Sequence, residues 1–137
     1  STLRKKDVLL LKGLFGNLPN KANYIEALMA RYGLTLKQNE YVFERGNTER
    51  NLYYLAEGKI NLTSNGTSVR ELNVGDYFGE LAMLTNQPTR FDAVVSSDEA
   101  RIIVIYAENI DTMLADDPKV AMQLLRQMAG RLQTSFT

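Results

Sequence analysis

The sequence predicts a mainly β domain, an antiparallel sandwich or small barrel, with helices before and after it. Between residues 34 and 106, seven short segments alternate apolar and polar residues or are rich in β-branched ones, and turn-forming residues separate them at short intervals. The segments on either side have helical spacing of their apolar residues. Many short, regularly spaced strands are typical of a sandwich or barrel rather than of a parallel sheet.

The first part, residues 3–32, is predicted to be helical. Residues 6–15 mix apolar and basic side chains, and the breaker sequence GNLPN follows at 16–20. Asn20 can cap a second helix over about Lys21–Tyr32, and Gly33 is expected to end it.

The predicted strands lie at residues 34–36, 41–43, 52–55, 59–62, 68–72, 93–95 and 101–106. The Asn65-Gly66 pair predicts a tight hairpin between the fourth and fifth strands, because both residues tolerate a positive φ.

Two helices are predicted after the last strand. A short one covers residues 109–114, and Asp117 caps Pro118 at the start of a long helix that runs to about Thr134. One apolar stripe follows this long helix: Val120, Leu124, Leu125, Met128 and Leu132. The stripe is expected to pack on the β domain, with a dimer seam or a moving lid as alternatives.

Composition excludes several function classes. The 137 residues are enough for one domain, and the chain has 16 basic and 16 acidic residues, so nothing favours nucleic-acid binding. It has no histidine and no cysteine, which removes histidine-based catalysis, metal sites with these ligands and disulfides. No run of apolar residues is long enough to span a membrane, so we expect no membrane insertion. The absence of a signal segment and of cysteine makes a cytoplasmic location the expectation. Without histidine, cysteine or a recognisable ligand cluster, we expect neither a cofactor nor enzyme activity.

Residues 76–84 do not fit a strand, although they lie inside the β-rich zone. Gly79 followed by ELAML predicts one helical turn whose first amides are free to bind an anion. Arg90 could return to the same anion as a bidentate cation, and Glu80 could accept a hydrogen bond from a sugar hydroxyl. These residues predict a pocket for a phosphate attached to a ribose. The alternative is a turn that closes one end of the barrel, with a structural Glu80–Arg90 ion pair.

The segment from FGELA at 78–82 to PTR at 88–90 resembles the phosphate-binding cassette of cyclic nucleotide-binding domains, including the sensor domains of cAMP receptor protein-type (Crp/Fnr-like) regulators. Further similar segments are YVFERG at 41–46, LYYLAEGKI at 52–60, LNVGDYFGE at 72–80 and QMAGRLQ at 127–133. The resemblance covers nearly the whole chain.

The resemblance implies an antiparallel jelly-roll β-barrel (a double-stranded β-helix) with N-terminal helices and a long C-terminal helix. It implies one domain over 1–137: helices at 1–33, the barrel at 34–106 with the cassette at 78–91, and helices at 107–137. The implied ligand is cAMP or cGMP, and the implied site residues are Phe78, Gly79, Glu80, Leu81, Ala82, Arg90, Phe91, Thr134 and Ser135.

The family's roles for these residues carry over by position. Gly79 and the amides of Leu81 and Ala82 would hold the cyclic phosphate, Arg90 would pair with it, and Glu80 would bind the ribose 2′-hydroxyl. Thr134 and Ser135 lie where the long helix approaches the base.

One departure from the family lies just after the arginine, where small residues are usual and this chain has Phe91 and Asp92. Phe91 lacks a hydroxyl, and a desolvated Asp92 would repel the phosphate. Strand alternation places Phe91 and Ala93 on one face, so Asp92 can point away from the pocket.

The expected function is a regulatory domain that binds a cyclic nucleotide and relays its occupancy through the terminal helices to an attached effector. One alternative is a degenerate fold that serves as an interaction or homodimerisation module through the C-terminal helix. Another is the sensor half of a transcription regulator, with DNA binding carried outside this chain.

Overall fold

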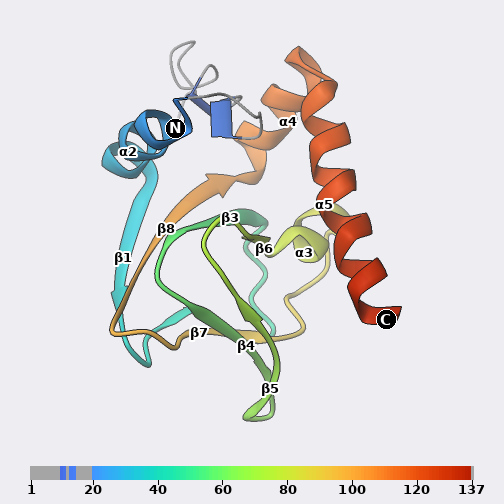
Figure 1. The fold of residues 1–137 in the computed structure, drawn as a ribbon. Helices are drawn as coiled ribbons and strands as arrows, with labels where there is room; N and C mark the ends of the chain where they lie inside the picture. Colours follow the sequence, from blue (N-terminus) through green and yellow to red (C-terminus); the bar gives the residue numbers. More distant parts are fainter. Residues whose placement is uncertain (1–9, 12, 15–19, 137) are drawn as a thin grey trace. The chain divides into compact units, whose positions relative to one another are not determined.

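The computed structural model describes residues 10, 11, 13, 14 and 20–136, with the side chains of residue 127 and of residues 131–136 left out. The chain divides into two compact units (Figure 1). One is Met29–Ala107, and the other combines Ser1–Leu28 with Glu108–Thr137.

The first unit consists of two four-stranded antiparallel sheets. One sheet has the order β1-β8-β3-β6, formed by Gly33–Lys37, Glu99–Tyr106, Asn51–Glu57 and Tyr77–Phe78. The other has the order β2-β7-β4-β5, formed by Tyr41–Phe43, Asp92–Val95, Ile60–Ser64 and Thr67–Leu72. The predicted antiparallel jelly roll is confirmed, but across the described residues the two sheets are not closed into a barrel.

Apolar side chains from both sheets form the core of this unit. One sheet contributes Tyr53, Leu55, Phe78, Ala100 and Ile102, and the other contributes Phe43, Ile60, Leu72, Ala93 and Val95. Within the core the rings of Phe43, Tyr53 and Phe78 pack together, with the Tyr53 and Phe78 centroids 5.2 Å apart. Inward-facing residues of this kind give the two sheets a common interior.

All seven predicted strands are present, and one strand was missed. Tyr77 and Phe78 form β6, which pairs with Tyr54 and Tyr53 of β3. The expectation that residues 76–84 contain no strand was therefore wrong for these two residues. A strand of two residues is too short for its alternation to be visible in a sequence.

The predicted hairpin between β4 and β5 is confirmed. Asn65 and Gly66 both have positive φ, 52° and 80°, as a two-residue turn of this hand requires. The same hairpin projects at one end of the unit in Figure 1.

The predicted helices are confirmed where the structure describes them. Helix α2 covers Lys21–Tyr32, and the Asn20 carbonyl accepts its first hydrogen bonds. Gly33 follows it, where a Cβ would lie 2.3 Å from the Met29 carbonyl oxygen. Of the predicted helix at 6–15, residues 10, 11, 13 and 14 are helical and the rest lies outside the described residues.

Helices α4 and α5 cover Ala107–Asp116 and Lys119–Phe136. The Asp117 carboxylate accepts a hydrogen bond from the Lys119 amide at 3.1 Å, which confirms the predicted cap. In the predicted stripe Val120 and Leu124 are buried, but Leu125 is 56% exposed, so its place in the stripe was wrong. It lies next to Leu124 in sequence, about 100° around the helix. The Leu132 side chain lies outside the described ones.

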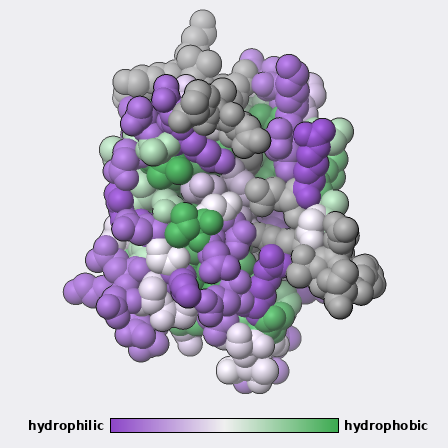
Figure 2. Space-filling model, viewed as in Figure 1, coloured by the Kyte–Doolittle hydropathy of each residue, from purple (hydrophilic) through white to green (hydrophobic). Residues whose placement is uncertain are grey.

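The face shown in Figure 2 is mostly hydrophilic, with separate small groups of apolar side chains. Within the described residues no helix is both long and apolar enough to cross a membrane.

Candidate functional site

The cassette, residues 78–91, begins in the core and leaves it at Gly79. The Phe78 ring is fully buried. Its side chain is therefore used in packing, and only its backbone remains for the ligand contact expected from the sequence.

Gly79 has a φ of 80° and lies against β3. A Cβ at this position would be 3.0 Å from the Asn51 carbonyl oxygen and 3.0 Å from the Tyr53 ring. Burial raises the pKa of Tyr53, and the Asn51 side chain donates a hydrogen bond to its hydroxyl at 3.3 Å. The turn is therefore held close to a rigid, neutral surface that has no space for a larger residue.

Helix α3, Glu80–Thr85, follows with Gly79 as its N-cap. The Met83 amide makes the first helical bond, to the Gly79 carbonyl at 3.2 Å. The amides of Leu81 and Ala82 have no hydrogen-bond acceptor among the described residues. The predicted free donors are thus present. Glu80 is buried at 9% exposure, in the first turn of the same helix.

The end of α3 is held by a residue that the sequence analysis missed. The Arg50 guanidinium donates from Nε and Nη2 to the Met83 carbonyl, at 3.2 and 2.9 Å. Arginine at a helix C-terminus satisfies carbonyls that the helix leaves open. A lone arginine before a strand gives no signal of this contact in the sequence.

Thr89, also missed, fastens the other end of the cassette to the β2–β3 turn. Its hydroxyl donates to the Glu44 carbonyl at 2.8 Å and accepts from the Asn47 amide at 3.0 Å. Its backbone makes two further hydrogen bonds, with the Gly46 amide at 2.8 Å and the Asn47 carbonyl at 3.0 Å. The side chain next to Arg90 is therefore fixed in place by the fold.

Both ends of the cassette consequently contact one short stretch of chain. Gly79 lies on Asn51, and Thr89 is bonded to Asn47, four residues away. Four residues span at most about 14 Å. The segment 47–51 thus limits the distance between the two ends of the cassette.

Arg90 is exposed, and it has neither a hydrogen bond nor an ion pair among the residues described. The alternative Glu80–Arg90 ion pair is therefore not formed. The guanidinium remains available for an anion from solution.

Asp92 points away from the interior. Its Oδ1 accepts a hydrogen bond from the Arg45 amide at 2.7 Å, while the adjacent Ala93 is fully buried. The carboxylate is thus partnered outside the core face, as strand alternation suggested. Phe91 is partly buried.

Thr134 and Ser135 lie on α5, with side chains that the structure does not describe. These residues and the cassette belong to different units, so their place in the site stays a prediction. A separate open hollow of about 450 Å³ is lined by residues 41 and 43–47 and by no residue of the cassette.

Comparison with known protein families shows to which family this chain belongs. The model of the cyclic nucleotide-binding domain matches residues 34–117, well over half of the chain. The chain belongs to this family. In this chain the matched residues, 34–117, include the strands of both sheets, apart from the first residue of β1, as well as the cassette and α4.

Relatives of this cyclic nucleotide-binding domain are parts of larger proteins. A protein named as a potassium channel protein, from Rhodopseudomonas palustris, is 27% identical over 114 residues, which are 80% of this chain and 26% of that protein. A CRP-like cAMP-activated global transcriptional regulator from Mycobacterium tuberculosis is 29% identical over 97 residues, 67% of this chain and 43% of that protein. The chain thus spans about a quarter of the first relative and less than half of the second.

Among solved structures, the catabolite activator protein of Thermus thermophilus matches with a TM-score of 0.69 and 25% identity. The match covers 90% of this chain and 59% of that protein. The family is one of regulatory sensor domains.

Proposed function

We propose that this domain binds a cyclic nucleotide, cAMP or cGMP, at the cassette. The amides of Leu81 and Ala82 would donate to the cyclic phosphate, and Arg90 would pair with it. Glu80 would accept a hydrogen bond from the ribose 2′-hydroxyl. The observation that carries the proposal is that these two amides and the Arg90 guanidinium lack partners within the described structure, in one cassette whose ends both rest on residues 47–51.

Charge supports the same assignment. The carboxylate that would oppose a phosphate, Asp92, is bonded to the Arg45 amide on the other side of its strand. Guanidinium groups bind phosphate oxygens in a bidentate manner, and charge-assisted bonds of this kind are roughly twice as strong as neutral ones.

Calorimetric titration with cAMP and with cGMP tests the proposal. Arg90→Ala should weaken binding at least tenfold, since each tenfold step is about 1.4 kcal/mol and a charged bond is lost. Arg45→Ala is the matched control, because Arg45 is exposed on the neighbouring turn and its side chain has no ion-pair partner among the described residues. Absence of binding to the unmodified domain at millimolar nucleotide would contradict the proposal.

The larger size of the relatives supports a second step, which is relay to an effector attached to this domain. Helices α4 and α5 follow the β unit directly and would change position or mobility when the site is filled. A ligand can shift such an equilibrium only by its different affinities for the two states. Hydrogen exchange of residues 107–136 with and without nucleotide measures this shift, and unchanged exchange in the saturated domain would contradict the relay.

A second candidate function is an interaction or homodimerisation module without nucleotide binding. Phe91 favours it by lacking a hydroxyl, and Met122 and Leu125 on α5 favour it by being 50% and 56% exposed. Under this hypothesis Phe91→Ser would restore nucleotide binding, and Leu125→Glu would dissociate a dimer seen by sedimentation velocity. A monomer that binds nucleotide would exclude it.

A further inference from the structure

Arg50, the residue before β3, is partly buried and bonds a single carbonyl group of helix α3. Its Nε and Nη2 donate to the Met83 carbonyl at 3.2 and 2.9 Å. The guanidinium forms no ion pair among the described residues, so this carbonyl is its only polar partner there. Because a guanidinium is planar and its donors have fixed directions, the two bonds hold α3 in direction as well as in distance.

The backbone of α3 leaves the Met83 carbonyl without a donor among the residues that the structure describes. The amides of Asn86 and Gln87, which follow the helix, both donate to the Ala82 carbonyl instead. Met83 is buried, at 2% exposure, and a buried carbonyl without a donor is unfavourable. Arg50 therefore supplies the donors that this end of the helix lacks.

Two consecutive residues thus contact both ends of α3. At its start the Asn51 carbonyl lies against Gly79, where an added Cβ would be 3.0 Å away. At its end Arg50 bonds Met83. The two amides that lack an acceptor in the described structure lie between these contacts. A helix of six residues is too short to be stable in isolation, so the direction of its free amides depends on residues 50 and 51.

The segment that carries Arg50 is braced by its own hydrogen bonds. The Asn47 side chain accepts one from the Glu49 amide at 2.7 Å. The Asn51 side chain donates to the Glu49 carboxylate at 3.4 Å and to the Tyr53 hydroxyl at 3.3 Å. These bonds hold the backbone on both sides of Arg50, so its side chain starts from a fixed position.

Hydrogen bonds to an anion weaken steeply when the N–H groups point away from it, and donors that are already aligned bind more tightly than donors that must first be ordered. Resting on the proposed function above, we propose that Arg50 is a positioning residue that sets nucleotide affinity. It aligns the Leu81 and Ala82 amides from the far end of α3 and does not contact the ligand. Without Arg50 the end of α3 would open, and these amides would lose their common direction.

Calorimetric titration of Arg50→Met and Arg50→Lys with cAMP and with cGMP tests the proposal. Arg50→Met keeps the aliphatic bulk but has no donor, and it should weaken the binding of both nucleotides about tenfold. Arg50→Lys keeps the charge, but an ammonium cannot form the planar pair of bonds, so its affinity should lie between the two. Full affinity in Arg50→Lys would assign the loss to charge and overturn the positioning role.

Hydrogen exchange of the domain without nucleotide separates a local effect from a general loss of stability. The Met83 amide bonds the Gly79 carbonyl within α3 at 3.2 Å. The Leu55 amide of β3 bonds the Asp76 carbonyl at 3.0 Å. In Arg50→Met the exchange rate of the Met83 amide should rise about tenfold relative to that of Leu55. An equal change at both amides would mean that Arg50 only stabilises the fold as a whole.

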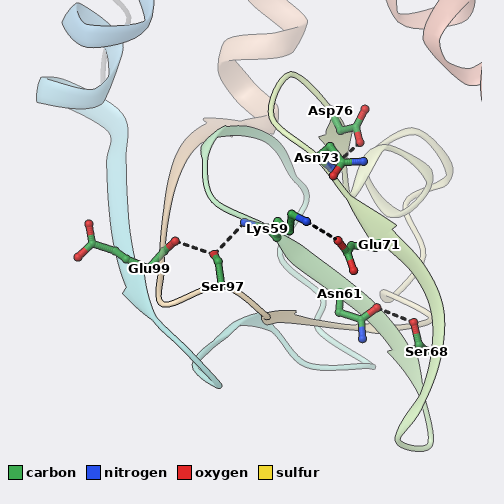
Figure 3. A network of polar contacts seen from close by, with 8 residues as sticks. All are labelled: Lys59, Asn61, Ser68, Glu71, Asn73, Asp76, Ser97 and Glu99. Atoms are coloured by element: carbon green, nitrogen blue, oxygen red, sulfur yellow. Dashed lines mark hydrogen bonds and ion pairs between the residues drawn. The ribbon is translucent and has the colours of Figure 1, made fainter.

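Ser97→Ala is the matched control, because the Ser97 side chain also joins separate pieces of backbone in the same unit. Its hydroxyl accepts a hydrogen bond from the Lys59 amide at 2.9 Å and donates one to the Glu99 carbonyl at 2.7 Å (Figure 3). None of these residues belongs to the cassette, so this variant should leave nucleotide affinity unchanged. A loss as large as that of Arg50→Met would show that any lost bond of this kind weakens binding, and would overturn the proposal.

The outcomes separate this proposal from the proposed function. If the unmodified domain binds nucleotide and Arg50→Met binds it equally tightly, the role of Arg50 is overturned and nucleotide binding stands. If the unmodified domain binds no nucleotide, both are overturned. Should Arg50→Met unfold, Arg50→Lys gives the same test, because it should still bind more weakly than the unmodified domain.

Discussion

Gly79 and Gly66 have the same backbone φ of 80°, but their surroundings differ. Gly66 lies in the β4–β5 turn, where a Cβ would meet nothing within 4 Å. At Gly79 the same Cβ would meet the backbone of Asn51 and the ring of Tyr53. One glycine is required by conformation alone, and the other by conformation and space together.

This pair predicts different costs for the same substitution. Gly66→Ala should reduce the free energy of unfolding by about 1–2 kcal/mol, the cost of a left-handed alanine. Gly79→Ala should cost at least about 1 kcal/mol more, because β3 must move as well, and it should weaken nucleotide binding. Urea denaturation of both variants measures the difference. Equal decreases in the free energy of unfolding for the two variants would show that β3 can move away from an added Cβ at residue 79 without a cost in stability.

At the residue scale the sequence predicted conformation better than contacts. The helical turn at Gly79 and the outward direction of Asp92 follow from local rules of turn chemistry and strand alternation. Thr89 and Arg50 could not be found this way, since their partners lie 45 and 33 residues away. Phe78 was placed in the site by resemblance, and only the fold shows that its ring belongs to the core.

Strands β3 and β6 form an element whose tyrosines are buried as neutral groups. The Tyr54 and Tyr77 rings lie 5.0 Å apart. Burial raises the pKa of Tyr77 far above the ordinary value, and the neighbouring Tyr54 adds to the shift. Burial also raises the pKa of Tyr54, with a further contribution from Asp76.

These shifts predict loss of stability in alkali. Above about pH 10 tyrosines ionise in the unfolded chain but stay protonated in the fold, so the free energy of unfolding falls with rising pH. The slope should be about 1.4 kcal/mol per pH unit for each such tyrosine. Tyr77→Phe should remove about one tyrosine's share between pH 10 and 11 in urea titrations.

Elements were predictable in proportion to their length. Helix α2 and the longer strands carry enough apolar positions to show a period, whereas β6 has two residues and is defined only by pairing with β3. In α5 the helical spacing predicts an apolar stripe along the helix. Which residues at the edge of the stripe are buried depends on what packs against the helix, and local sequence does not contain that information. Leu125 was therefore assigned to the stripe although it lies in solvent.

On the scale of the whole molecule, the two sheets of Met29–Ala107 depend on one interior. Phe78→Ala should lower the free energy of unfolding by about 3–5 kcal/mol, because it empties a fully buried aromatic site. Leu81→Ala, three residues later at 55% exposure, should change it by less than about 0.5 kcal/mol. Denaturant midpoints give both values. A small effect of Phe78→Ala would mean that the sheets can close over the gap.

The four hydrogen bonds of Thr89 join pieces of chain that lie some forty residues apart. The position of Arg90 is consequently set by the turn after β2, and not chiefly by its own neighbours in sequence. An insertion or deletion within that turn would therefore shift Arg90 relative to the amides of Leu81 and Ala82, although every residue of the proposed site would still be in the chain.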